Sequence, residues 1–187
     1  MNILNTFINN LCGTFDNKNQ VSLELKENKL IHPKAMHING ICNDKIFNIP
    51  TNFHGFFVLE ESYYEIGNFK NSLPHLFLFT LNADGNIVLT SYDIPNNIKK
   101  EDFRNDNLNL KMNFNDLKIS EKFTPMTYIY KNGEFKGESI SHFNSKTTFI
   151  LRETVKDNIL EVSEVFKKDG KITFGFESPI IYEKISK

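Results

Sequence analysis

Turn dipeptides constrain the fold of this chain more than any other feature of its sequence. An Asp-Gly pair at 84–85 separates the apolar runs 73–81 and 87–94. An Asn-Gly pair at 132–133 and an Asp-Gly pair at 169–170 lie in similar settings in the C-terminal third. Pairs of this kind between alternating apolar runs are typical of tight β-hairpins. The chain is therefore predicted to fold as a series of antiparallel hairpins.

The candidate strands recur about every ten residues, which is typical of an antiparallel meander. They are residues 35–41, 56–64, 73–81, 87–94, 124–131, 134–143, 145–155, 159–168, 171–176 and 179–185. About nine or ten strands is close to the number at which a twisted sheet curls closed. With 187 residues and no visible linker or repeat, the chain is predicted to form one mainly-β domain over 1–187, a single antiparallel barrel.

One or two short helices are predicted ahead of the barrel. Residues 2–11 place apolar side chains at helical spacing, which favours a short amphipathic helix. The next segment is ambiguous, because Asp16 can cap a second helix whereas residues 21–25 alternate like a strand. Gly13 and Phe15 are interpreted as the start of the first strand. There the glycine permits a tight turn and the aromatic ring plugs one end of the barrel.

The composition favours β-structure and argues against several functions. The chain has 18 Phe, 6 Tyr and hardly any Ala, a balance that suits strands better than helices. Its formal net charge is −1, so it lacks the basic excess that nucleic-acid binding requires. It has no apolar run near the roughly 20 residues that cross a bilayer and no signal-peptide pattern. The sequence therefore predicts no nucleic-acid partner, no membrane span and a cytoplasmic location.

Common catalytic and cofactor motifs are missing from the sequence. It has no phosphate-binding loop, dinucleotide fingerprint, zinc-protease motif or paired C-x-x-C. The histidines are scattered, so neither a metal site nor a required cofactor is expected. Cys42 and His37 are excluded as a nucleophile and base, because their spacing along a strand puts them on opposite faces and about 16 Å apart. Cys12 and Cys42 are expected to be reduced thiols, with a disulfide as the alternative.

The adjacent carboxylates Glu60 and Glu61 are the first candidates for chemistry inside a barrel. Neighbouring strand residues point to opposite faces, so one of the two faces inward if the other faces outward. An inward carboxylate can anchor a polar or cationic group of a ligand, or donate a proton if burial raises its pKa. The alternative is that both carboxylates are solvated at the end of a strand.

The strand at 73–81 is apolar on both faces, with His75, Phe77 and Phe79 on one of them. Such a strand is expected to be covered on both sides. The barrel interior is predicted to cover one side and the N-terminal helices the other. The interior is then either packed solid or lined for an apolar ligand.

A short helix is followed by G-x-F-D-N-x-x-Q at 13–20 and by the strand FFVLEES at 56–62. The hairpin at 73–94 and the later run of strands and turns come next. This layout resembles that of the T-type phycobiliprotein chromophore lyases, calycin-type barrels that hold a linear tetrapyrrole and transfer it to a cysteine of a phycobiliprotein subunit. The resemblance implies a calycin- or lipocalin-like barrel, a bilin ligand and a phycobiliprotein acceptor. It also implies the cytoplasm, or the plastid stroma in a photosynthetic eukaryote.

The chain departs from that family at positions that bear on the ligand. Where the family has Glu-Gln, Glu60 is followed by a second glutamate, and His142 lies where the family usually has a cysteine. The strand that is rich in Tyr and Arg in the family has His75 as its polar group here. Only Arg104 and Arg152 are available to pair with carboxylates. These departures favour a more apolar ligand than a dicarboxylate tetrapyrrole.

Three functions follow from these observations. The first is a ligand-binding barrel, either a bilin chaperone or lyase or a relative that binds another hydrophobic molecule. The second is an enzyme that acts on a small molecule in the lumen, with Glu60, Glu61 and His75 as acid/base candidates. The third is a solid barrel whose outer surface binds another protein. The candidate ligand-binding residues are Glu60, Tyr63, His75, Phe77, Phe79, Tyr92, His142 and Arg152.

Overall fold

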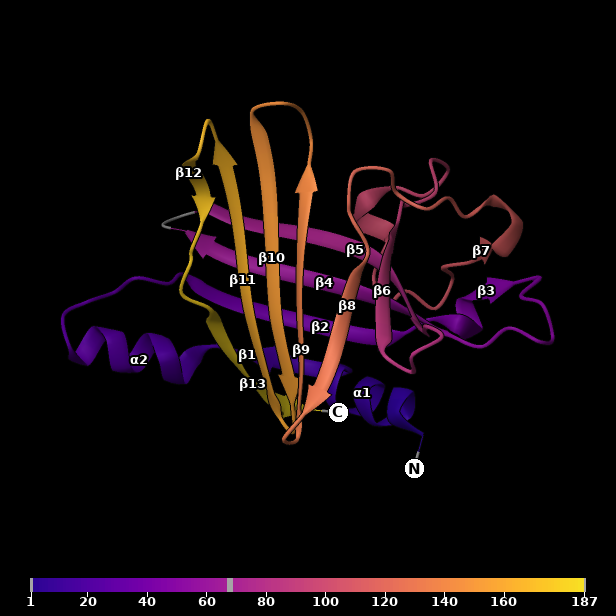
Figure 1. Ribbon diagram of the computed structural model, residues 1–187, viewed down its shortest axis with the longest axis horizontal. Helices are drawn as coiled ribbons and strands as arrows, with labels where there is room; N and C mark the ends of the chain where they lie inside the picture. The colour runs from indigo at the N-terminus through magenta and orange to yellow at the C-terminus, as the bar shows by residue number, and fades with distance from the viewer. Residues whose placement is uncertain (1, 67–68, 187) are drawn as a thin grey trace.

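The computed structural model describes residues 2–66 and 69–186, in which ten strands close into an antiparallel barrel (Figure 1). In order around the ring they are β1 (Gly13–Asp16), β2 (Lys34–Ile41), β4 (Phe56–Ile66), β5 (Phe69–Leu81), β6 (Ile87–Tyr92), β8 (Met126–Lys131), β9 (Glu134–His142), β10 (Thr147–Lys156), β11 (Ile159–Lys168) and β13 (Ile180–Ser186). Each strand pairs with the next, and β13 pairs with β1 to close the ring. The prediction of a mainly-β, calycin- or lipocalin-like barrel is confirmed.

The other described elements lie outside the ring. Strand β12 (Lys171–Gly175) pairs with the end of β11, and β3 (Ile46–Phe47) pairs with β7 (Met112–Asn113) in a separate two-stranded sheet. Helices α1 (Ile3–Leu11) and α2 (Lys18–Lys26) flank β1, so the segment that was ambiguous from its sequence is helical. Neither helix in the described part of the chain is long and apolar enough to cross a membrane.

The hairpin turns form at the predicted dipeptides. Both residues at 132–133 and both at 169–170 have φ between 49° and 84°, the geometry of type I′ turns, whose twist matches that of the strands. In the third turn Gly85 has φ 77°, and the backbone N–H of Asn82 donates to the carbonyl of Asn86 at 2.9 Å. The dipeptides therefore set the order of hairpins that builds the ring.

Gly13 lies where the ring closes. Its φ is 137°, and a Cβ at this position would lie 2.6 Å from the carbonyl oxygen of Ser186 on β13. Glycine thus permits the close approach of β1 to β13. Phe15, two residues further on, is fully buried in the interior core. The interpretation of these two residues as the start of the first strand is confirmed.

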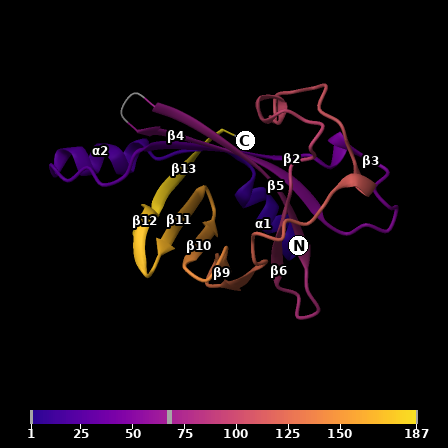
Figure 2. The ribbon, with the colours of Figure 1, turned by 90° about the horizontal axis from the view of Figure 1, so that it is seen from above.

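The first helix packs into the interior at one end of the barrel (Figure 2). Its apolar residues Leu4, Phe7, Ile8 and Leu11 are buried. The ring of Phe7 lies 5.1 Å from that of Phe79 on β5 and 4.7 Å from that of Tyr128 on β8, centre to centre. This end of the lumen is therefore filled by side chains.

A second apolar cluster covers the outer face of β4 and β5. Here Phe57, Leu59, Leu76 and Leu78 pack against the connecting segments 42–55 and 93–119. These segments include 3₁₀ turns at Asn43–Lys45, Lys100–Asp102 and Phe114–Asp116. Both faces of β5 are covered as predicted, but the prediction that the N-terminal helices cover the outer face is wrong. The apolar face of α1 already packs in the lumen, and α2 extends away from the barrel (Figure 1).

Candidate ligand site inside the barrel

A small cavity lined by both polar and apolar side chains lies inside the barrel, between the core around α1 and a group of phenylalanines. Its volume is about 40 Å³, whereas a cavity needs about 10–15 Å³ by the same measure to hold one water molecule. The polar side chains that line it include His37, Glu60, His75, Glu153 and Glu164. They come from β2, β4, β5, β10 and β11 respectively. The cavity has room for a small polar group of a few atoms, and titratable and apolar side chains both line it.

Glu60 is the inward member of the pair of adjacent glutamates. On β4 it lies opposite Asn39 of β2 and His75 of β5, and it is buried. The hydroxyl of Ser62 donates to Glu60 Oε1 at 3.0 Å. Of the two possibilities left open by the sequence, the structure thus places Glu60 in the lumen.

Glu60 and His37 form a buried ion pair. Glu60 Oε2 lies 3.4 Å from Nδ1 of His37. Burial is the largest single effect on Glu60 and would raise its pKa, but His37, His75 and the hydroxyl of Ser62 together lower it. Burial is also the largest single effect on His37 and would lower its pKa, but Glu60, with smaller contributions from Glu164 and Glu153, raises it. The charged form of each of these two side chains is therefore stabilised by the charge of the other.

The hydrogen bonding of His37 is incomplete. Although His37 is 2% exposed, its Nε2 has no hydrogen-bond partner among the described residues, and its Nδ1 meets Glu60 only as an ion pair without hydrogen-bond geometry. The neighbouring ring of Tyr182 lies 4.4 Å away, centre to centre, and its hydroxyl is also without a partner there. Buried polar groups in native proteins are nearly always hydrogen-bonded, to protein, water or ligand. A polar guest in the adjacent cavity would meet this requirement.

Glu153 faces the cavity from the opposite wall. The hydroxyl of Tyr128 donates a hydrogen bond to its Oε2. Burial and the negative charge of Glu60 raise the pKa of Glu153 to about 8. Glu153 is therefore protonated at neutral pH while Glu60 is ionised. A third carboxylate, Glu164, accepts a hydrogen bond from the hydroxyl of Tyr64 at 3.1 Å.

Phenylalanines gather on the other side of the cavity. Phe77, Phe123 and Phe149 line it directly. The ring of Phe149 lies 5.7 Å from that of Phe123 and 4.7 Å from that of Phe166. Phe143 touches the same rings and is 37% exposed. We call Phe77, Phe123, Phe143, Phe149 and Phe166 the phenylalanine cluster; it connects the cavity to the surface through apolar side chains.

Three of the predicted ligand-binding residues, Glu60, His75 and Phe77, meet at this cavity. Phe79 lies deeper, in the core around Phe7. The other predicted residues lie elsewhere. Tyr92 packs in the outer apolar cluster, Tyr63 donates a hydrogen bond to Glu61, His142 is exposed, and Arg152 pairs with Glu138.

Glu61 faces outward and holds a connecting segment. Its Oε1 accepts the backbone N–H of Asn105 at 2.8 Å and the side-chain amide of Asn105 at 3.0 Å. That amide also donates to the carbonyl of Leu59 at 3.1 Å. Glu61 therefore fixes the segment around Asn105 on the outer face of β4.

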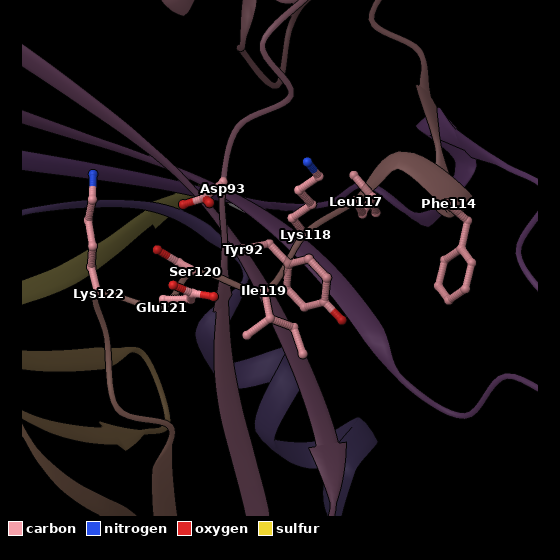
Figure 3. Close-up of a pocket in the computed structure, with 9 residues that line it drawn as sticks. All are labelled: Tyr92, Asp93, Phe114, Leu117, Lys118, Ile119, Ser120, Glu121 and Lys122. Atoms are coloured by element: carbon pink, nitrogen blue, oxygen red, sulfur yellow. The ribbon is translucent and has the colours of Figure 1, made fainter.

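A much larger hollow, of about 730 Å³, lies on the outside of the barrel (Figure 3). It runs along Tyr92, Asp93, Phe114 and residues 117–122. Figure 3 shows side chains of both charge signs along it, and all of these charged groups are exposed. Exposed charges stay hydrated and contribute little to the affinity or specificity of ligand binding. We therefore place the candidate site at the interior cavity, where the polar groups are buried.

These features define a class of protein: closed antiparallel barrels with the layout of calycins and lipocalins, here with a small cavity of mixed polar and apolar lining in the core. Comparison of the chain with models of protein families, with curated proteins and with solved structures found no match. Within the described residues, no three His, Cys, Asp or Glu side chains are arranged to hold a metal ion. Cys12 and Cys42 are free thiols. The interior cavity is thus the basis for a functional proposal.

Proposed function

We propose that the protein binds a small molecule whose polar end occupies the interior cavity and whose apolar body lies against the phenylalanine cluster. The observation that carries this proposal is His37, a buried imidazole beside the cavity that pairs with Glu60 by charge but has no hydrogen-bond partner for its ring nitrogens in the described structure. An unsatisfied buried polar group costs about 1–3 kcal/mol. A bound polar group that completes the hydrogen bonding of His37 removes that cost.

The size of the cavity determines how such a ligand binds. Cavities that enclose a drug-sized ligand measure about 300–1,000 Å³, whereas this one measures about 40 Å³. Only the polar end of a ligand fits, and the remainder lies among Phe123, Phe143 and Phe149. A bilin, the ligand that the sequence resemblance implies, is much larger than the cavity. It would bind only if the phenylalanine cluster opened.

Ligand titrations of the purified protein test this proposal. Biliverdin, haem and a fluorescent fatty-acid probe are titrated while absorbance and fluorescence are recorded. We expect at least one of them to bind with a Kd in the micromolar range, about 8 kcal/mol of binding free energy. Glu60→Gln should weaken that binding about tenfold, while Glu138→Gln, on the outer face of β9, should not change it.

Failure of every ligand of the panel to bind would overturn the proposal. The barrel would then be a solid scaffold, which is the protein-interaction function considered from the sequence. Binding that is equally strong in the wild type and in Glu60→Gln would also overturn it, because the ligand would not reach the cavity.

A further inference from the structure

We propose that Ser178 is an activated nucleophile for acyl transfer from apolar esters, with His32 as its general base and Glu24 as the group that positions His32. None of these three is among the described residues that line the interior cavity. The proposal therefore goes beyond ligand binding in the lumen and concerns a second site. The geometry of the three side chains carries it.

Three segments that are far apart in the sequence meet at this site. Glu24 lies on α2, His32 lies in the connection from α2 to β2, and Ser178 lies in the connection from β12 to β13. These two connections lie side by side (Figure 1). Gln20 of α2 ties the second connection to the helix, because its side-chain amide donates to the carbonyl of Pro179 at 3.0 Å. The fold therefore brings a hydroxyl, an imidazole and a carboxylate together.

The imidazole of His32 faces the hydroxyl of Ser178. Its Nε2 lies 3.0 Å from Oγ of Ser178, and a general base takes a proton over about 2.6–3.2 Å. His32 is 3% exposed, whereas Ser178 is exposed. A substrate can therefore reach the hydroxyl while the base beside it is shielded from water. The carbonyl oxygen of Ser178 also lies 3.2 Å from Nε2, and it is an acceptor for the N–H that forms there when His32 takes the proton.

Glu24 fixes the tautomer of His32. Its Oε1 lies 2.5 Å from Nδ1 of His32, and its Oε2 accepts the backbone N–H groups of Ile31 at 2.8 Å and His32 at 2.9 Å. Burial would raise the pKa of Glu24, but these hydrogen bonds together lower it. The amide nitrogen of Gln20 lies farther from Nδ1, at 3.1 Å. An ionised carboxylate takes the proton of Nδ1, so Nε2 of the neutral imidazole is left to accept the hydroxyl proton of Ser178.

A hydroxyl, an imidazole and a carboxylate that are bonded in this order form the arrangement of serine hydrolases. This arrangement is recognised by its geometry and not by sequence position. The backbone N–H of the nucleophilic serine commonly helps to bind the oxyanion of the intermediate. The backbone N–H of Ser178 donates no hydrogen bond within the described part of the chain, so it is free for this role.

The surroundings of the hydroxyl favour an apolar, uncharged substrate. The ring of Phe176 lies 5.1 Å from that of His32, centre to centre. Leu30 and Ile31, which precede His32, are 58% and 54% exposed. Glu24 carries a negative charge at the site and disfavours an anionic substrate. A neutral ester with an apolar acyl chain therefore fits these surroundings.

The reaction that this arrangement supports is ester hydrolysis in two steps. Oγ of Ser178 bonds to the carbonyl carbon of the ester and gives its proton to Nε2 of His32. The bond from that carbon to the leaving oxygen then breaks, and the leaving alcohol takes the proton from His32. Water next attacks the acyl-serine, giving a proton to His32, which returns it to Oγ of Ser178 as the carboxylic acid leaves. Ester and water become acid and alcohol, with no change in oxidation state.

Two probes test the nucleophile. The purified protein is mixed with p-nitrophenyl butyrate, and the release of p-nitrophenolate is followed by absorbance. We expect a burst of about one p-nitrophenolate per protein molecule, followed by slower turnover. Separately, the protein is treated with an alkyl fluorophosphonate, which phosphonylates activated serines and releases fluoride. Mass spectrometry of the digested protein should place this adduct on Ser178.

Variants assign the roles. Ser178→Ala should abolish the burst and the adduct, whereas Ser145→Ala, an exposed serine between β9 and β10, should behave like the wild type. His32→Gln should slow acylation at least about a hundredfold. Glu24→Gln should lower kcat by a similar factor with little change in KM, and Glu24→Asp should recover part of the loss. If His32→Gln does not fold, which circular dichroism shows, Ser178→Ala and Glu24→Gln decide the question.

The possible failures have different meanings. If neither a burst nor an adduct forms, or if the adduct lies on another residue, Ser178 is not the nucleophile and the three side chains only hold α2 against β13. If Ser178 reacts equally fast in His32→Gln, the role given to His32 is wrong. If Glu24→Gln leaves kcat unchanged, the role given to Glu24 is wrong. None of these results touches the proposed function, because Ser178→Ala should bind the ligands of the lumen as the wild type does.

Discussion

Tyr128 on β8 donates a hydrogen bond to Glu153 on β10 across the strand that lies between them. Both residues lie opposite Gly137 of β9 in the strand register. A Cβ at this glycine would lie 2.9 Å from Cγ of Met126 and 3.1 Å from Cδ1 of Tyr128. The missing side chain therefore gives the ring of Tyr128 the space that it needs to reach Glu153.

Gly137→Ala should break the hydrogen bond between Tyr128 and Glu153. The added methyl group would push the ring of Tyr128 away from Glu153 and destabilise the protein by about 1–3 kcal/mol, the usual range for an overpacked core. Urea denaturation measures this change in the free energy of unfolding. Lys136→Ala, an exposed neighbour on the same strand, serves as the control and should cost far less. Equal stability of the two variants would contradict this account of the glycine.

The protonation of Glu153 predicts how stability depends on pH. Its pKa is about 8 in the folded protein, against an ordinary value of 4.5. Between these two values the folded state binds more protons than the unfolded state. Stability should therefore fall as pH rises through this window, by up to about 1.4 kcal/mol per pH unit.

Glu153→Gln should flatten this slope, because glutamine stays neutral at every pH. The variant should be more stable than the wild type at about pH 8, as measured by urea denaturation at a series of pH values. A weaker slope of the same sign should remain near neutral pH, because the raised pKa of His37 acts in the same direction. Parallel curves for variant and wild type would show that Glu153 does not titrate in this range.

The sequence could predict the barrel but only half of its interior site. Hairpin dipeptides and alternating runs are local features, so the order of the strands could be read from them directly. The alternation of side chains along a strand also required Glu60 and Glu61 to face opposite ways. Which of the two faces the lumen, however, depends on the pairing of β4 with β2 and β5. Glu153 and Glu164 were missed because the strands that carry them have polar residues on both faces. An inward polar residue is recognisable only after the ring has closed and fixed the register.

The contribution of Gly13 to closing the ring can be measured against a second glycine with positive φ. Gly13→Ala introduces both backbone strain and a contact at 2.6 Å with the carbonyl oxygen of Ser186. Gly85→Ala introduces strain alone, since no atom lies within 4 Å of the added Cβ. The strain costs about 1–2 kcal/mol, so Gly85→Ala should lose about this much and Gly13→Ala clearly more. A smaller loss for Gly13→Ala would contradict the close approach of β1 and β13.

The neighbours Glu60 and Glu61 should give opposite results when each is replaced by alanine. Glu61→Ala leaves the backbone N–H of Asn105 without its acceptor, which costs about 1–3 kcal/mol. It should speed hydrogen exchange around residue 105 but leave ligand affinity unchanged, because Glu61 lies outside the barrel. Glu60→Ala should abolish ligand binding and leave exchange around residue 105 slow, because it removes a group from the lumen.

Hydrogen exchange read out by mass spectrometry, together with the ligand titration, measures both effects in each variant. Affinities are compared at a temperature where circular dichroism shows both variants to be folded, so that lost stability is not mistaken for lost binding. If Glu61→Ala weakened ligand binding as much as Glu60→Ala, the ligand would not be confined to the lumen. If Glu60→Ala also sped exchange around residue 105, the inner and outer faces of β4 would be coupled. The division of roles between the two carboxylates would then be wrong.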